Sequence, residues 1–249
     1  MLKRSPLLSE QVKAHLKARI LSHEFADGRI PPETELASEL GVSRTTVREA
    51  LSRLESEGSI YRKQGVGTFV NESGLQIKSP LDEIWSYEAV LRAHGYAPVT
   101  RLLSCERVAA PPEVAQTLHL SPREPVWAMR KLFLEDDRPV ILADNFVPTR
   151  LVPAESLSEE DAQGPIYTFL ERFGRISLAY YLTDLVPVAA DATLERWLAL
   201  PPRAPLLSFA ETGYSPDHQP IVRAYSYFRD DRLRFRLIRR SQNASTAYS

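Results

Sequence analysis

The chain has 249 residues, of which 43% are hydrophobic and 25% are charged, a composition typical of a globular protein rather than a disordered or fibrous one. Lys and Arg together number 31 and Asp and Glu number 32, so the chain as a whole is not a polycation, although a local basic patch is still compatible with this balance. The single cysteine, Cys105, excludes an intramolecular disulfide framework and a four-thiolate zinc site.

Signals for export or membrane insertion are not visible. The N-terminal apolar stretch is far shorter than the core of a secretory signal, and no run of about 18 apolar residues lacks a charge. Because the chain has a single cysteine, no visible export signal and no visible membrane-spanning segment, we expect a cytoplasmic protein in a reducing compartment, without a membrane partner.

The first segment of the chain predicts three short helices, because apolar residues recur at helical spacing in three runs. These runs are Val12, Leu16 and Ile20; Leu36 and Leu40; and Val47, Ala50, Leu51 and Leu54. Gly41 suits a tight turn between the second and third helices, and Ser43 suits the N-cap of the third. The order predicts a helix-turn-helix.

Residues 59–70 contain two short β-prone runs on either side of Gly65-Val66-Gly67. This pattern predicts a β-hairpin, or wing. Small, polar and helix-breaking residues then follow, which favours a linker. We therefore expect a helix-turn-helix domain with a wing over residues 1–72, a linker over 73–80, a second domain over 81–240 and a tail over 241–249. No internal repeat with a period of 20–50 residues is apparent.

The second segment predicts an α+β domain whose sheet is largely antiparallel, because short turns join several neighbouring strands. The expected strands cover 99–108, 126–135, 139–147, 177–188, 205–214, 219–228 and 232–239. The expected helices cover 81–94, 112–119, 165–173 and 190–199.

The start of the third predicted helix has the chemistry of a DNA-reading element. Arg44 and Arg48 lie one turn apart on one face, arginine can contact guanine through two hydrogen bonds, and Thr45 and Thr46 can contact a thymine methyl or a phosphate. The alternative is a short exposed helix whose arginines are merely solvated.

Several spaced blocks in this segment resemble the winged helix-turn-helix of GntR-type bacterial transcription regulators. They are Pro31 to Ala37, Gly41 to Leu51, Glu57-Gly58 and Gly65 to Val70. The resemblance implies DNA contacts at Ser43, Arg44, Thr45, Thr46, Arg48, Gln64 and Gly65, and at position 34. The chain departs from the family in carrying Pro32 where serine is usual and Thr34 where arginine is frequent, so the serine's helix cap and the arginine's possible operator contact are absent.

The remainder, over about 80–240, resembles the UTRA effector domain of the HutC-like branch, a fold also seen in chorismate lyase. The resemblance rests on blocks such as Gly95 to Pro98, Arg130 to Leu134 and Phe228 to Arg232. It implies that a small metabolite binds beside the sheet, with Lys131, Phe133, Tyr167 and Val222 as the effector residues.

The same resemblance bears on the kind of effector. Members that sense amino-sugar phosphates carry arginines where this chain has Lys131 and Phe133, serine at Pro165 and glutamate at Val222. Lost arginines and a lost carboxylate weaken oxyanion and hydroxyl binding. We therefore expect an effector less polar than a phosphosugar, with Lys131 meeting one carboxylate or phosphate; the alternative is that Lys131 is an ordinary surface lysine.

Other candidate chemistry finds little support in the sequence. The run from Arg232 to Arg240 alternates with Leu233, Phe235 and Leu237, which is typical of a half-buried strand rather than of a second nucleic-acid site. The five histidines lack metal-ligand spacing, no phosphate-binding loop or nucleophile elbow is present, and Cys105 is expected to be packed. We expect no metal, cofactor or catalytic residue.

The sequence therefore predicts a ligand-responsive transcription regulator that is not an enzyme. By resemblance it is a repressor released by a small metabolite and acts as a homodimer on a palindromic double-stranded DNA operator, since one recognition helix reads only a few base pairs. The alternatives are a chorismate-lyase-type enzyme with an added DNA-binding module, and an architectural DNA-binding protein without an effector.

Overall fold

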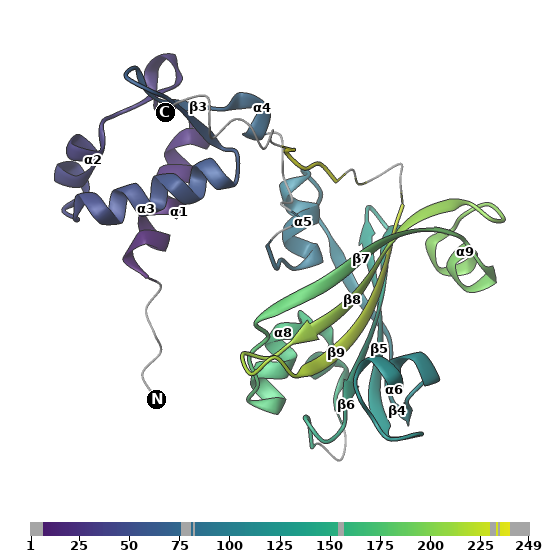
Figure 1. The fold of residues 1–249 in the computed structure, drawn as a ribbon. Helices are drawn as coiled ribbons and strands as arrows, with labels where there is room; N and C mark the ends of the chain where they lie inside the picture. The colour runs from purple at the N-terminus through teal and green to yellow at the C-terminus, as the bar shows by residue number, and fades with distance from the viewer. Residues whose placement is uncertain are drawn as a thin grey trace. The chain divides into compact units, whose positions relative to one another are not determined.

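The computed structural model describes residues 7–75, 81, 83–153, 157–229, 233 and 235–239. The chain divides near residue 82 into two compact units, with the described residues 235–239 grouped with the first (Figure 1). Each unit has its own core, and each is described separately below.

The first unit contains the three predicted helices and the predicted wing. The helices are α1 (Leu8–Leu21), α2 (Glu33–Leu40) and α3 (Arg44–Ser56), and the wing strands are β2 (Ile60–Lys63) and β3 (Gly67–Val70). A short 3-10 turn, η1 (Ala26–Gly28), leads into β1 (Arg29–Ile30), which pairs with β3 to give the order β1-β3-β2. Two residues are too few for a periodic signal, so the sequence did not predict β1.

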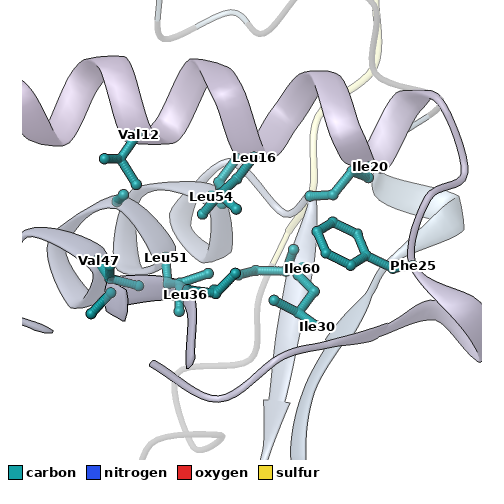
Figure 2. Packing of buried hydrophobic residues seen from close by; sticks show 12 residues of the cluster. Val12, Leu16, Ile20, Phe25, Ile30, Leu36, Val47, Leu51, Leu54 and Ile60 are labelled. Atoms are coloured by element: carbon teal, nitrogen blue, oxygen red, sulfur yellow. The ribbon is translucent and has the colours of Figure 1, made fainter. Parts of the chain in front are cut away.

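The core of this unit forms where the apolar faces of the three helices meet the small sheet. Leu16, Leu36 and Leu54 are fully buried there, and Figure 2 shows side chains from α1, α2, α3 and the strands converging on one another. The i, i+4 spacing of the apolar residues in α1 places them on this single face. The predicted helical periodicity is therefore confirmed.

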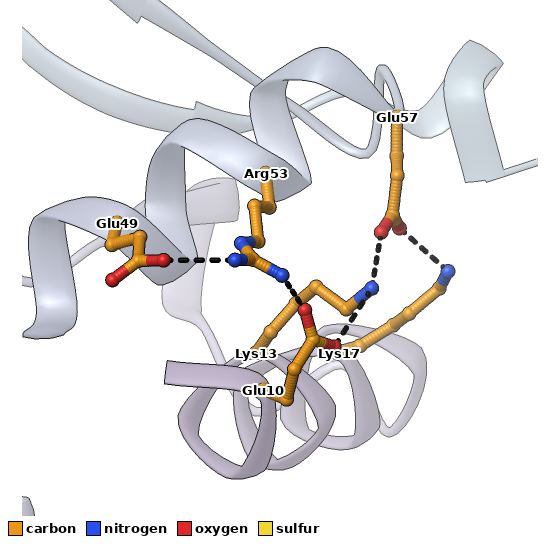
Figure 3. Close-up of polar contacts among 6 residues, drawn as sticks. All are labelled: Glu10, Lys13, Lys17, Glu49, Arg53 and Glu57. Carbon is orange, nitrogen blue, oxygen red and sulfur yellow. Dashed lines mark hydrogen bonds and ion pairs between the residues drawn. The ribbon is translucent and has the colours of Figure 1, made fainter. Parts of the chain in front are cut away.

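Ion pairs reinforce the packing of α1 against α3. Glu57, the C-cap of α3, accepts hydrogen bonds from Lys13 Nζ at 2.8 Å and Lys17 Nζ at 2.7 Å. Arg53 contacts Glu10 on α1 and Glu49 on its own helix, as Figure 3 shows. These contacts hold the helix that carries the candidate DNA-reading residues against its neighbour.

The start of the predicted linker contains a short helix. Residues 72–75 form a helical turn, α4 (Glu72–Leu75), and the remainder of the predicted linker, 76–80, lies outside the described residues. Asn71 Nδ2 donates to the Gly58 carbonyl at 2.8 Å. A Cβ on Gly74 would overlap that carbonyl, so glycine lets the turn pack against the base of the wing.

The second unit is built on one antiparallel sheet of six strands in the order β4-β5-β6-β9-β8-β7. The strands are β4 (Val99–Ala109), β5 (Pro125–Glu135), β6 (Arg138–Pro148), β7 (Tyr180–Ala189), β8 (Pro205–Tyr214) and β9 (Pro220–Phe228). The helices are α5 (Tyr87–Ala93), α6 (Pro112–Thr117), α7 (Glu159–Gln163), α8 (Ile166–Phe169) and α9 (Ala192–Leu198). The predicted α+β class and antiparallel sheet are confirmed.

The two halves of this sheet have the same architecture. Each runs strand, helix, strand, strand, as β4-α6-β5-β6 and as β7-α9-β8-β9. Identical residues recur 80 positions apart, including Ala110 and Ala190, Leu118 and Leu198, and Arg123 and Arg203. Both arginines have positive φ, 63° and 57°, so the local backbone repeats as well. This period is longer than the 20–50 residues typical of solenoid and propeller repeats.

Both faces of the sheet are covered. On one face Trp127, Met129 and Val222 pack with Phe169 and Leu170 of the α8 segment. On the other, α9 packs through Leu194 and Leu198 against Leu132 and Leu142, and α6 covers a further cluster around Val126. The face under α8 is the one that carries Lys131, since residues 127, 129 and 131 of β5 alternate to the same side.

Some predicted elements of the second unit were wrong in extent. The helix expected over 81–94 begins only at Tyr87, because the Ser86 side chain caps it by accepting from the Ala89 N–H at 3.1 Å. The helix expected over 165–173 is α8 followed by a π-helical turn, η2 (Leu170–Gly174). The short helix α7 was not predicted.

The strand predicted over 232–239 is also wrong. The described residues 233 and 235–239 are not in a strand. Leu233 is buried, but Leu237 is 60% exposed, so alternation of apolar and basic residues here does not reflect a half-buried sheet. Along the chain, β9 is the last strand among the described residues, and it already pairs with β6 on one side and β8 on the other, so no further strand can pair beside it.

Candidate nucleic-acid interface and ligand site

The first turn of α3 presents polar side chains to solvent. Ser43 caps the helix, with its Oγ accepting from the Thr46 N–H at 3.1 Å and lying 2.8 Å from Thr46 Oγ1. Arg44 and Thr45 are exposed, and Thr46 is partly buried. Exposed N–H groups and the positive end of the helix dipole at this terminus favour an anion such as phosphate.

Arg48 lies one turn further along α3 and is held by a carboxylate of α2. Its Nε and Nη2 donate to Glu33 Oε2 at 3.1 and 3.0 Å. The hydrogen bond from Arg48 lowers the pKa of Glu33, and the charges of Arg48, Arg62 and Arg44 lower it further. Glu33 therefore sits among three arginines and orients one of them.

The departures at Pro32 and Thr34 have visible structural consequences. Pro32 occupies the N-cap of α2 and makes no side-chain cap hydrogen bond. Thr34 is exposed in the first turn of that helix. The first turn carries Glu33 and Glu35 instead, which favour the positive end of the helix dipole.

The wing presents Gln64 and Gly65 at its exposed tip. Gly65 has φ of 71° with open space around it, which suits both the turn and a close approach by a backbone. Beside the tip lies a groove of about 410 Å³ lined by residues 29–32 and 62–68. None of these described lining residues carries a carboxylate.

Three basic side chains that line this groove were not predicted from the sequence as DNA-binding residues. Arg29 Nη2 donates to the Val66 carbonyl at 3.0 Å, and Lys63 lies over the rings of Tyr61 and Phe69 at 5.6 and 5.4 Å. Arg62 lies 3.4 Å from Glu55. Only the pairing of β1 with β3 brings Arg29 to the wing, so no local sequence signal identifies it.

In the second unit, Lys131 is 3% exposed. Its Nζ donates to the Gly164 carbonyl, which ties β5 to the loop before α8. Burial lowers the pKa of Lys131 to about 8, and the negative charge of Glu88 opposes this shift. The alternative that Lys131 is an ordinary surface lysine is therefore wrong.

Phe133 follows Lys131 on the same face and is buried in an aromatic group. Its ring meets Tyr87 edge-on at 5.1 Å between centroids, and Tyr87 meets Phe228 in the same way at 5.7 Å. Phe209 completes the group against Phe228. These rings pack on one another on the side of Lys131 that faces α5.

Tyr167 and Val222 lie on another part of this face. Tyr167 is partly buried in α8. Burial raises the pKa of Tyr181, and the negative charge of Glu211 raises it further, with a smaller contribution from Tyr167. Val222 is fully buried with Trp127, and Tyr181 packs against the same cluster. Lys131, Phe133 and Val222 thus share one face of the sheet, and Tyr167 belongs to α8, the helix that packs on that face.

The sequence did not point to a partly buried carboxylate on this face, Glu211. Glu211 of β8 accepts a hydrogen bond from Thr183 Oγ1 at 2.9 Å. Burial raises its pKa, while hydrogen bonds from Thr183 and Tyr87 act in the opposite direction. The sequence signal that could have identified Glu211 is its position as the one acidic residue in the largely apolar run 205–214.

Other chemistry remains without structural support among the described residues. They contain no group of three or more histidine, cysteine or acidic side chains that could hold a metal ion, and none of their helices has both the length and the apolar character needed to cross a membrane. Burial raises the pKa of the Cys105 thiol, which disfavours the reactive thiolate.

Comparison with known proteins identifies two domain families in the chain. Residues 8–70 match bacterial regulatory proteins of the gntR family, and residues 93–234 match the UTRA domain. The HTH-type transcriptional repressor NagR of Bacillus subtilis is 30% identical over 94% of this chain and 95% of its own length. The histidine utilization repressor of Pseudomonas aeruginosa is 32% identical over 74% of this chain and 76% of its own length.

Solved structures agree in fold. The "possible transcriptional regulator YydK" from Bacillus subtilis superimposes with a TM-score of 0.74 at 16% identity, covering 94% of this chain and all of that one. PhnF from Mycobacterium smegmatis gives a TM-score of 0.58 at 24% identity over 93% of this chain and all of its own. These identities establish the shared fold alone.

Proposed function

The chain belongs to the GntR family of bacterial transcription regulators, in the HutC-type branch that carries a UTRA domain, and we propose that it is a homodimeric repressor released from a palindromic operator by a small metabolite. It is a regulator and not an enzyme, like the repressors to which it is similar. The observation that carries the DNA-binding part is the exposed, Ser43-capped first turn of α3 with Arg44 and Arg48 on one face.

We propose that Arg44, Thr45, Thr46 and Arg48 enter the major groove, while the wing tip approaches the minor groove. Thr34 and Ser43 lie at helix starts, where phosphate contacts are favoured. Selection and sequencing of genomic fragments retained at about 0.15 M salt tests this, because salt suppresses non-specific binding. A recovered palindrome supports the proposal, and no enrichment over random fragments contradicts it.

Substitutions can distinguish sequence-specific contacts to bases from non-specific electrostatic attraction to the DNA backbone. Arg44→Ala should relax sequence preference, since a bidentate contact contributes about 1–3 kcal/mol of discrimination. The matched control is Arg92→Ala, which removes an exposed arginine of the second unit. If Arg44→Ala and Arg92→Ala showed the same preference for the operator sequence over other DNA, Arg44 would not contact bases.

A homodimer is supported by the edge strand β7. This strand has β8 on one side only, and Leu182 is 62% exposed, with Leu185 and Val186 also exposed. Long apolar edges are rarely left open to solvent. Light scattering should give twice the chain mass, and Leu182→Lys should shift the population toward the monomer; a monomeric unsubstituted protein would contradict the proposal.

For the effector we propose a metabolite with one anionic group held by Lys131 and an apolar body near Phe133, Tyr167 and Val222. A buried ammonium with a single carbonyl acceptor among the described residues is what supports an anion partner. An anion competing with the Gly164 carbonyl would release the loop before α8, which is a route to altered DNA binding. Tight binding of phosphosugars, with no binding of apolar carboxylates, would contradict this choice.

A further inference from the structure

The two-half architecture of the second unit places two ionisable side chains, one buried and one partly buried, at equivalent positions. Lys131 of β5 and Glu211 of β8 are 80 residues apart, the spacing of the repeat. Lys131 lies opposite Ala143 of β6, and Glu211 lies opposite Ala224 of β9. Since β6 and β9 are neighbours at the centre of the sheet, the two charges flank that centre.

Both side chains lie on the same face of the sheet. Across the strands, Lys131, Ala143 and Ser226 are in register, and so are Asn145, Ala224 and Glu211. Residues in register across a sheet share a face, and so do residues two apart along a strand. Asn145 and Ser226 are buried polar side chains of the two central strands, so a polar strip with opposite charges at its ends crosses an otherwise apolar face.

Each end of this strip has hydrogen-bonding capacity beyond its protein partners. The Lys131 ammonium has three donors and one acceptor among the described residues, the Gly164 carbonyl. Glu211 accepts from Thr183 and Tyr87, whereas a carboxylate has about four acceptor sites. Tyr87 also contacts Ser226, which links the Glu211 end to the centre of the strip.

We propose that this strip binds an amphoteric metabolite, with its carboxylate or phosphate at Lys131 and a protonated nitrogen at Glu211. Three strand spacings separate β5 from β8, about 14 Å between backbones, so the two charged groups of the ligand are separated by several bonds. The apolar body lies across Phe133 and its aromatic neighbours. This inference rests on the proposed effector site and adds the second charge, which excludes simple anions as the best ligands.

Thermal shift and calorimetry with the full chain test the pairing. The probes are ω-aminoalkanoates of increasing chain length, aminomethyl-substituted aromatic carboxylates, and the matching acids that lack the amine. We expect the amino compounds to bind at least tenfold more tightly than their matched acids at the best length, since a charge-assisted hydrogen bond in a buried site supplies that factor. Glu211→Gln should reduce this ratio to about one, and Lys131→Met should abolish binding of both series.

The matched control is Glu106→Gln, which removes an exposed carboxylate of β4 and should leave the ratio unchanged. Equal or tighter binding of the plain acids by the unsubstituted protein would overturn this inference while leaving the anion site at Lys131 intact. Retention of the amine preference in Glu211→Gln would also overturn it. Binding of neither series would overturn this inference, while DNA selection tests the regulator proposal separately.

Discussion

Replacing Lys131 by methionine should change how the stability of the second unit depends on pH. The ammonium is 3% exposed, and burial holds its pKa near 8, whereas lysine in an unfolded chain titrates near 10.4. The folded state therefore releases this proton at lower pH than the unfolded state does. The cost of burying the charge is present in full below about pH 8 and is relieved as the pH rises from 8 toward 10.4.

The magnitude follows from these two pKa values. Between pH 7 and pH 10, the free energy of unfolding of the protein with Lys131 should rise by about 2.5 kcal/mol relative to that of the methionine variant. Each pH unit between the two pKa values contributes about 1.4 kcal/mol to this rise. Methionine has similar length and no charge. The difference in unfolding free energy between the two proteins should thus shift by this amount in favour of lysine.

Urea unfolding followed by tryptophan fluorescence measures this difference in the right part of the chain. All three tryptophans, Trp85, Trp127 and Trp197, belong to the second unit. Subtracting the methionine variant removes the titration of other groups that the two proteins share. A difference that stays flat from pH 7 to pH 10 would refute the reasoning, and so would one that moves in favour of methionine, because that would mean a partner charge raises the lysine pKa.

Three further predictions concern the first unit, whose unfolding can be followed by circular dichroism. Ser43→Ala should destabilise it by about 1 kcal/mol, because the cap on α3 is lost, whereas Ser43→Asn should restore most of the stability. Leu54→Ala should cost about 2–5 kcal/mol, since this side chain is fully buried; a cost under 1 kcal/mol would contradict the packing shown in Figure 2. Burial raises the pKa of Glu57, but the hydrogen bonds from Lys13 and Lys17 outweigh it, so the pKa is lowered overall. Glu57→Gln should therefore destabilise the unit at neutral pH. The difference should begin to shrink only as the pH falls through the ordinary glutamate value of about 4.3 and should vanish below the lowered pKa of the folded protein.

The sequence determined the local elements of the first unit. Helical spacing of apolar residues, Gly41 at the turn and Ser43 at the cap act over a few neighbouring positions, so α2, α3 and the exposed first turn of α3 follow from the sequence. The same holds for most strands of the second unit, whose β-prone runs end at turn residues. The alternation of apolar and basic residues wrongly predicted a strand at residues 233 and 235–239, because a strand forms only where a neighbouring strand can pair with it.

Tertiary structure alone decided which distant residues share a surface. The pairing of β1 with β3 brings Arg29 to the wing groove, and the two-half sheet places Lys131 and Glu211 on one face. Burial, and with it the lowered pKa of Lys131, arises only when α8 and its preceding loop cover that face. Residue type and spacing encode interactions between near neighbours, whereas desolvation and charge proximity depend on long-range packing, which no local pattern specifies.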